Sequence, residues 1–261
     1  MDKQKCYYEH EGSEDILFDC YDEENKVCAR CCVEVCQNEE NVLYSACLAA
    51  GHPTWLKTEQ LKLAPNKLIC LETYWNSGQI FNELSVKPFL TALLPLLRNN
   101  LKIGHRFVET LQGMKYYTLY PNGVLWKDEL TFDNPLFYLA FHGKAGSVYS
   151  VLDEIDSKNL CEAFSDYGQY NNIIYFSACG IFRGTKGKKF AKDFLASSGT
   201  RAIFGYTEDV GWMESIVVDL LFIERFYKDD DPFNHLDKIY NSIMDDFKPA
   251  KALGFSMFTN S

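Results

Sequence analysis

The chain has 261 residues, of which 47% are hydrophobic and 24% charged, and its formal net charge is −10. This composition is that of a globular protein and excludes a disordered or collagen-like chain. Binding to a phosphate backbone needs a basic surface, but residues 1–65 carry a net charge of −7 and the remainder −3. We therefore expect no nucleic-acid partner.

The apolar runs of the chain are short. The longest, such as Leu220–Ile223, fall far short of the ~20 residues that span a bilayer. The first 15 residues contain no apolar stretch of the kind found in secretory signals. These features predict a cytoplasmic protein with no membrane contact.

The cysteines gather near the amino terminus, where seven of the ten lie within the first 47 residues. In a reducing compartment such clustering indicates metal binding rather than disulfides. The chain therefore divides into a Cys/His-rich module, residues 1–65, and a second domain, residues 66–261. Cys28 and Cys31 have the Cys-x2-Cys spacing that brings two sulfurs to one zinc ion. The alternative is a small reduced domain whose cysteines only pack.

The order of these cysteines and histidines resembles the B-box zinc finger of tripartite-motif proteins. The resemblance implies two structural Zn²⁺ ions. The first would be held by Cys6, His10, Cys28 and Cys31. The second would be held by Cys20, Glu23, Cys47 and His52. The chain departs from the family in a long gap after Cys31, and Cys32 and Cys36 are alternative ligands. The resemblance also implies that the module recruits a protein partner or drives self-association.

After residue 66, apolar runs with strand character alternate with segments of helical spacing. Strands are predicted at residues 67–73, 136–141, 173–177 and 201–206. Helices are predicted at residues 84–98, 156–167, 188–198, 212–227 and 234–247, with Pro95 interrupting the first. Residues 104–120 fit either type. Continuously apolar strands that alternate with helices indicate an α/β fold, with a mostly parallel sheet sandwiched by helices.

Two of the predicted strands end in residues that carry chemistry. His142-Gly143 follows one strand and Ala178-Cys179-Gly180 follows another. A thiol is mostly protonated at neutral pH and needs a base beside it to act as a nucleophile. If the two strands are neighbours, His142 could be that base, and the backbone N–H groups of Gly143 and Cys179 could form an oxyanion hole. The alternative is a core histidine and an ordinary buried cysteine.

The segments FYLAFHGKAG, IIYFSACGIFRG and FLASSGTRAIFGYTEDVGW resemble the caspase-like cysteine peptidases, above all their CHAT branch. The resemblance implies a caspase-like sheet with the His and Cys strands side by side. It also implies that His142 is the general acid/base and Cys179 the nucleophile of a peptide-bond hydrolase. The chain departs from the branch after the cysteine, where Gly-Ile-Phe-Arg replaces the commoner acidic-Thr-Gly. CHAT peptidases often act as effectors of prokaryotic defence systems.

Glu208 and Asp209 follow the strand at 201–206 and are candidates for substrate binding. A carboxylate there would favour Arg or Lys before the cleaved bond. Alternatively, Asp209 caps the next helix. Glu72, near the end of the first strand, is a weaker candidate for the same pocket.

The basic stretch Arg183–Lys189 lacks the spacing of a phosphate-binding loop, because only two residues separate its glycines. We expect a flexible loop, and a peptidase with an acidic pocket could cut it on activation.

Three functions compete on the sequence alone. The first is a cysteine endopeptidase acting on a protein substrate, with the zinc module as its partner-binding part. The second is a non-catalytic caspase-like scaffold, although a pseudo-enzyme usually loses one of the two catalytic residues. The third is an unrelated α/β hydrolase or ligand-binding domain.

Overall fold

A computed structural model describes residues 17–19, 26–28, 67–75, 84–97, 101–119, 123–124, 135–165 and 172–260. The chain divides into two compact units, Met1–Leu63 and Ala64–Ser261. In the first unit, strands β1 (Leu17–Asp19) and β2 (Lys26–Cys28) pair antiparallel.

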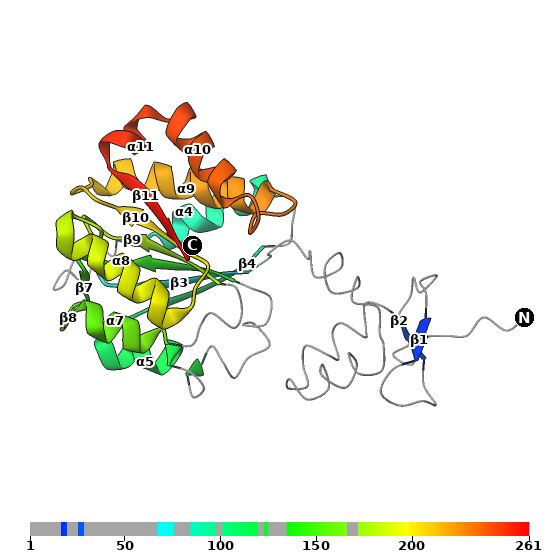
Figure 1. The fold of residues 1–261 in the computed structure, drawn as a ribbon, viewed down its shortest axis with the longest axis horizontal. Coiled ribbons are helices and arrows are strands. Elements are labelled where there is room, and N and C mark those ends of the chain that lie inside the picture. Colours follow the sequence, from blue (N-terminus) through cyan, green and yellow to red (C-terminus); the bar gives the residue numbers. More distant parts are fainter. Residues whose placement is uncertain are drawn as a thin grey trace, which may run out of the picture. The chain divides into compact units, whose positions relative to one another are not determined.

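The second unit is built around a six-stranded sheet with the order β11-β10-β9-β5-β3-β4 (Figure 1). The strands are β3 (Lys67–Glu72), β4 (Lys102–Phe107), β5 (Leu136–Ala140), β9 (Ile173–Ser177), β10 (Ala202–Tyr206) and β11 (Phe255–Thr259). All neighbouring pairs are parallel except β10 and β11. The predicted α/β class with a mostly parallel sheet is confirmed.

Helices cover both faces of this sheet (Figure 1). One face carries α4 (Lys87–Ala92), α9 (Trp212–Lys228), α10 (Leu236–Asp246) and α11 (Lys248–Ala252). The other carries α5 (Leu111–Thr118), α7 (Ser157–Ala163) and α8 (Gly184–Ser198). β3, β5 and β10 are buried along their whole length, because each is covered by helices on both sides.

Local signals explain where several helices begin and end. Asp156 accepts a hydrogen bond from the Asn159 amide at the start of α7, as an N-cap does. Gly199 ends α8 with a left-handed φ of 65°. Pro95 ends the α-helical part of the first predicted helix, since α4 stops at Ala92 and a 3₁₀ turn, η1 (Leu94–Leu96), follows.

The predicted flexible loop at Arg183–Lys189 is wrong, because α8 begins at Gly184. Gly187 is buried there, and a Cβ at this position would lie 2.2 Å from the carbonyl carbon of Phe182. The glycine is therefore required by close backbone packing and is not a sign of flexibility. Cleavage inside this segment would first require α8 to unwind.

Replacing Gly187 by alanine should lower the free energy of unfolding by about 1–3 kcal/mol. Alanine normally favours a helix over glycine by about 1 kcal/mol, but here its methyl group would overlap the Phe182 backbone. Thermal denaturation measures the effect, with the exposed neighbour Lys188→Ala as the control. A Gly187→Ala protein as stable as the wild type would contradict this packing.

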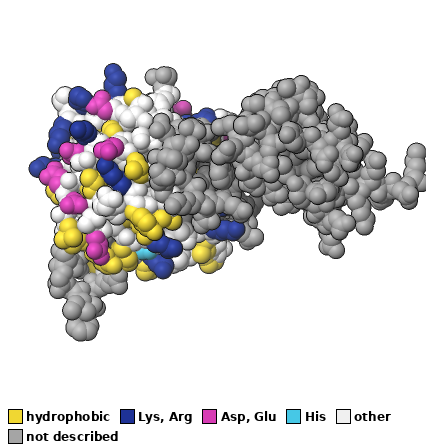
Figure 2. Space-filling model, turned by 90° about the horizontal axis from the view of Figure 1, so that it is seen from below, with side chains coloured by type: hydrophobic (Ala, Val, Ile, Leu, Met, Phe, Trp, Pro, Cys, Tyr) yellow, Lys and Arg dark blue, Asp and Glu magenta, His cyan; other side chains and the backbone are white. Residues whose placement is uncertain are grey.

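A small sheet of β6 (His142–Lys144), β7 (Ser147–Tyr149) and β8 (Glu154–Ile155) follows β5 and was not predicted. On the described part of the face in Figure 2, basic and acidic side chains are interspersed. Within the described residues, no helix is both long and apolar enough to cross a membrane.

Candidate functional site

The two strands that precede His142 and Cys179 are neighbours in the sheet. β5 and β9 pair parallel, and their register places Ala140 opposite Ser177. His142 lies two residues beyond Ala140, and Cys179 lies two residues beyond Ser177. Because the strands are parallel, both residues leave the sheet at the same edge, at the same level.

Close backbone packing joins the two segments beyond the sheet. A Cβ at Gly143 would lie 2.4 Å from the carbonyl oxygen of Cys179 and 2.7 Å from its nitrogen. Only glycine therefore lets the first residues of β6 pack on the Cys179 backbone. The Gly146 amide also donates to the carbonyl oxygen of Ile181 at 2.8 Å. The structure thus brings the hairpin that carries His142 against the loop that carries Cys179.

The thiol of Cys179 is half-buried, and it donates to the carbonyl oxygen of Val210 across 3.4 Å. His142 is exposed, and its ring makes an edge-to-face contact with the Trp75 indole, with ring centroids 4.9 Å apart and planes at 78°. The thiol proton thus points to Val210 in this structure. Rotation about the Cys179 Cα–Cβ bond would be needed to direct it elsewhere.

The segment after β10 holds the other side of the Cys179 loop. The Gly180 amide donates to the carbonyl oxygen of Glu208 at 2.8 Å, and the Phe182 amide donates to that of Tyr206 at 3.0 Å. The Cys179 loop is therefore held between the β6–β7 hairpin and the residues that follow β10.

Glu208 and Asp209 lie beside this loop, and both are exposed. Asp209 does not cap α9, whose N-cap residue is Gly211 without a side-chain hydrogen bond. Its carboxylate instead pairs with the guanidinium of Arg183 at 2.8 Å, and the two side chains are 77% and 42% exposed. So exposed a pair is weak. Asp209 could therefore exchange Arg183 for a cation of a bound peptide.

Glu72 ends β3 and is completely buried, where its two carboxylate oxygens accept four hydrogen bonds. Oε1 accepts from the Trp75 indole at 2.6 Å and from the Val86 amide at 2.7 Å. Oε2 accepts from Ser85 Oγ at 2.7 Å and is bonded to His105 Nε2 at 2.6 Å. Glu72 thus joins β3 and β4 to the segment that precedes α4. Because its carboxylate is buried and fully hydrogen-bonded, it does not line a substrate pocket, and that prediction is wrong.

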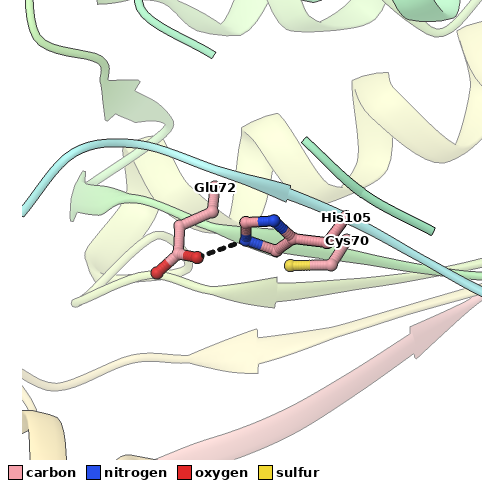
Figure 3. A group of neighbouring side chains, drawn as sticks. All are labelled: Cys70, Glu72 and His105. Carbon is pink, nitrogen blue, oxygen red and sulfur yellow. Dashed lines mark hydrogen bonds and ion pairs between the residues drawn. The ribbon is translucent and has the colours of Figure 1, made fainter. Parts of the chain in front are cut away.

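Cys70, Glu72 and His105 lie together on one face of β3 and β4, with their ligand atoms within 4.8 Å of one another (Figure 3). Burial, and then the charge of Glu72, raise the pKa of the Cys70 thiol well above its ordinary value. Each Glu72 oxygen already accepts two hydrogen bonds. The arrangement therefore fits a hydrogen-bonded anchor better than a metal site.

A second buried carboxylate, Asp219 of α9, lies under the ends of the strands. Tyr138 and Ser177 donate to its Oδ2, both at 2.5 Å. Tyr175 and Tyr206 donate to its Oδ1 at 2.6 and 2.5 Å. Burial raises the pKa of the Asp219 carboxyl, while the hydroxyl donors oppose that rise. The network joins α9 to β5, β9 and β10. Its member Ser177 lies two residues before Cys179.

The predicted zinc ligands belong to the first unit. Cys28 is the last residue of β2, and its side chain lies outside the described part of the structure. The same holds for Cys6, His10, Cys20, Glu23, Cys31, Cys47 and His52, and for the alternatives Cys32 and Cys36.

Sequence reasoning missed Trp75, His105 and Asp219. A signal existed for Asp219, which occupies the same helical stripe as Ile216, Phe222 and Ile223 and is therefore an acid on a buried face. Trp75 follows the first strand with no periodic pattern, and nothing in its sequence context indicates a histidine contact.

The fold and this sheet edge define an α/β protein in which a histidine and a cysteine follow the ends of two neighbouring parallel strands. The chain belongs to a family of unknown function (DUF6642), whose model matches residues 65–259. A comparison with curated proteins found no match.

Proposed function

We propose that this protein is a cysteine endopeptidase of caspase-like fold that hydrolyses peptide bonds through His142 and Cys179. The observation that carries the proposal is the packing of Gly143 on the Cys179 backbone at the ends of the paired strands β5 and β9. Cys179 is half-buried, and its loop is held from both sides.

In the proposed reaction the Cys179 thiol rotates away from Val210 and gives its proton to the His142 imidazole. The sulfur then attacks the peptide carbonyl carbon, and His142 returns the proton to the amine that leaves. Water, deprotonated by the same imidazole, then attacks the acyl carbon, the C–S bond breaks to give a carboxylic acid product, and the imidazolium returns its proton to the Cys179 sulfur. The Gly143 and Cys179 amides would donate to the oxyanion of each tetrahedral intermediate. Glu208 and Asp209 would favour a basic residue before the cleaved bond.

The remaining parts of the proposal rest on the sequence. The amino-terminal module would hold structural Zn²⁺ through the ligands named above and recruit a protein partner or drive self-association. The protein would act in the cytoplasm, and the resemblance to CHAT peptidases favours a role as a prokaryotic defence effector.

A non-catalytic scaffold is the second candidate, and one observation favours it. The Cys179 thiol donates to the Val210 carbonyl, and the His142 ring contacts Trp75. A binding protein would not need the Cys179 thiol and the His142 imidazole to contact each other.

Labelling with peptidyl electrophiles separates the two candidates. We expect a peptidyl-Arg or peptidyl-Lys acyloxymethyl ketone to modify Cys179 in the full chain, as mapped by mass spectrometry. Cys179→Ala should abolish the adduct, and His142→Ala should slow its formation by about 10²–10⁴-fold, the usual contribution of a general acid or base.

Cys161→Ser is the matched control, because Cys161 is also a partly exposed free thiol and should have no influence on the rate. Equal labelling of wild type and His142→Ala would favour the scaffold. Faster labelling by a peptidyl-Asp probe than by the basic probes would contradict the assigned role of Glu208 and Asp209 while leaving the peptidase intact.

A further inference from the structure

Trp75 lies between a fixed anchor and the expected catalytic histidine. Its indole N–H donates to Glu72 Oε1 at 2.6 Å. The same indole meets the His142 imidazole edge to face, at 4.9 Å between centroids and 78° between planes. One side chain thus contacts the end of β3 through its nitrogen and the start of β6 through its ring.

The anchor is rigid because Glu72 is held from several elements at once. It is fully buried and receives donors from β4 and from the two residues before α4, besides Trp75 itself. An ionised carboxylate accepts strong hydrogen bonds of this kind, and all of its acceptor positions are in use. If the Trp75 side chain rotated away, the buried Glu72 carboxylate would lose one of its hydrogen-bond donors.

Among the residues that the structure describes, no hydrogen bond or ion pair holds the His142 side chain, which is exposed at the start of a three-residue strand. An exposed imidazole samples several rotamers, and only some of them face the neighbouring Cys179 loop. The Trp75 indole beside the imidazole excludes some of these rotamers by steric overlap.

We propose that Trp75 is a positioning residue for His142, and that Glu72 fixes Trp75 for this purpose. The inference rests on the proposed function, in which His142 exchanges a proton with Cys179. Trp75 touches neither the sulfur nor the peptide bond in this reaction. It limits the orientations of the imidazole, and proton transfer depends steeply on that geometry.

The test uses Trp75→Leu, which removes the ring, and Trp75→Phe, which keeps a ring but loses the donor to Glu72. Glu72→Gln keeps the shape of the anchor and removes its charge. Tyr116→Leu is the matched control, because Tyr116 makes the same kind of edge contact with Tyr117, at 5.2 Å and 74°, and lies on α5, apart from the Glu72 anchor.

Two measurements are made on the full chain. The first is the NMR signal of the His142 ring in histidine-labelled protein, assigned by its loss in His142→Ala. The second is the rate of Cys179 alkylation by iodoacetamide as a function of pH. A role in folding alone would lower Tm but leave the shape of this pH profile unchanged.

We expect Trp75→Leu to shift the His142 ring signals more than those of the other histidines. Alkylation at neutral pH should slow by about 10–100-fold, and the dependence of its rate on pH should differ from that of the wild type. In Trp75→Phe and Glu72→Gln, the shift of the His142 signals and the loss of alkylation rate should be smaller than in Trp75→Leu. Tyr116→Leu should leave both the His142 signals and the alkylation profile as in the wild type.

Unchanged His142 signals together with an unchanged pH profile in Trp75→Leu would overturn the inference. Failure of the proposed function looks different: the wild type would then form no adduct with any peptidyl electrophile. The His142 signals would still report whether Trp75 fixes the ring.

Discussion

Replacing Asp219 by alanine should lower the free energy of unfolding by about 2–6 kcal/mol. The reason is the number of buried hydroxyls that share this carboxylate. Tyr206 could still donate to the Ser215 carbonyl oxygen at 3.1 Å, and Tyr175 could still bond to Tyr206 at 3.0 Å. Tyr138 and Ser177, which also bond to each other, would both lose the carboxylate that accepts from them, at about 1–3 kcal/mol each.

Thermal denaturation checks this result, and a loss of this size lowers Tm by at least about 4 °C in a protein of this length. Asp219→Asn should cost less, because the amide oxygen still accepts two of the hydroxyls. Asp193→Ala is the control, since Asp193 pairs with Lys189 on the surface and its loss should stay within about 0.5 kcal/mol. An Asp219→Ala protein as stable as the Asp193 control would contradict the network.

Replacing Gly143 by alanine should slow the labelling of Cys179 by a peptidyl electrophile by about 10²-fold. The new methyl carbon would lie 2.4 Å from the Cys179 carbonyl oxygen, so the two backbones would have to separate. A displacement of about 1 Å at reacting groups is enough for a loss of this order. The Gly143 and Cys179 amides, which we assign to the oxyanion, would move apart as well.

Gly104→Ala is the matched control, because a Cβ there meets nothing closer than the Leu68 carbonyl oxygen at 3.9 Å. Its labelling rate and its Tm should equal those of the wild type. If Gly143→Ala were labelled as fast as this control, the contact between the β6 hairpin and the Cys179 loop would have no part in the reactivity of the thiol.

Local sequence signals were enough for most of the second unit. The strand predicted at 173–177 matches β9 residue for residue, and the helix predicted at 212–227 differs from α9 by one residue. Both are long or continuously apolar, and such segments have one stable conformation in a core. Where the signal was mixed, residues 104–120 were left open between strand and helix, and the loop predicted at Arg183–Lys189 was wrong. β4 is an edge strand with alternating exposure, and the start of α8 contains two glycines and four lysines.

The candidate site divides in the same way. The positions of His142 and Cys179 at strand ends were predicted from the apolar runs before them, and the pairing of β5 with β9 agrees with the order that the family resemblance implies. The ion pair of Asp209 with Arg183 was not predicted, since both residues had been assigned to other roles. Nothing in the residues around Asp209 distinguishes a helix cap from an ion pair.

The sequence by itself determined the class of fold, the two-part organisation and the two residues on which the proposed chemistry depends, because apolar periodicity and glycine placement act over a few residues. Only the tertiary structure decided which side chains support them. Glu72 receives donors from three separate segments, and Asp219 collects hydroxyls from three strands. Contacts of this kind depend on how strands and helices pack, and side chains far apart along the chain leave no local pattern that would reveal them.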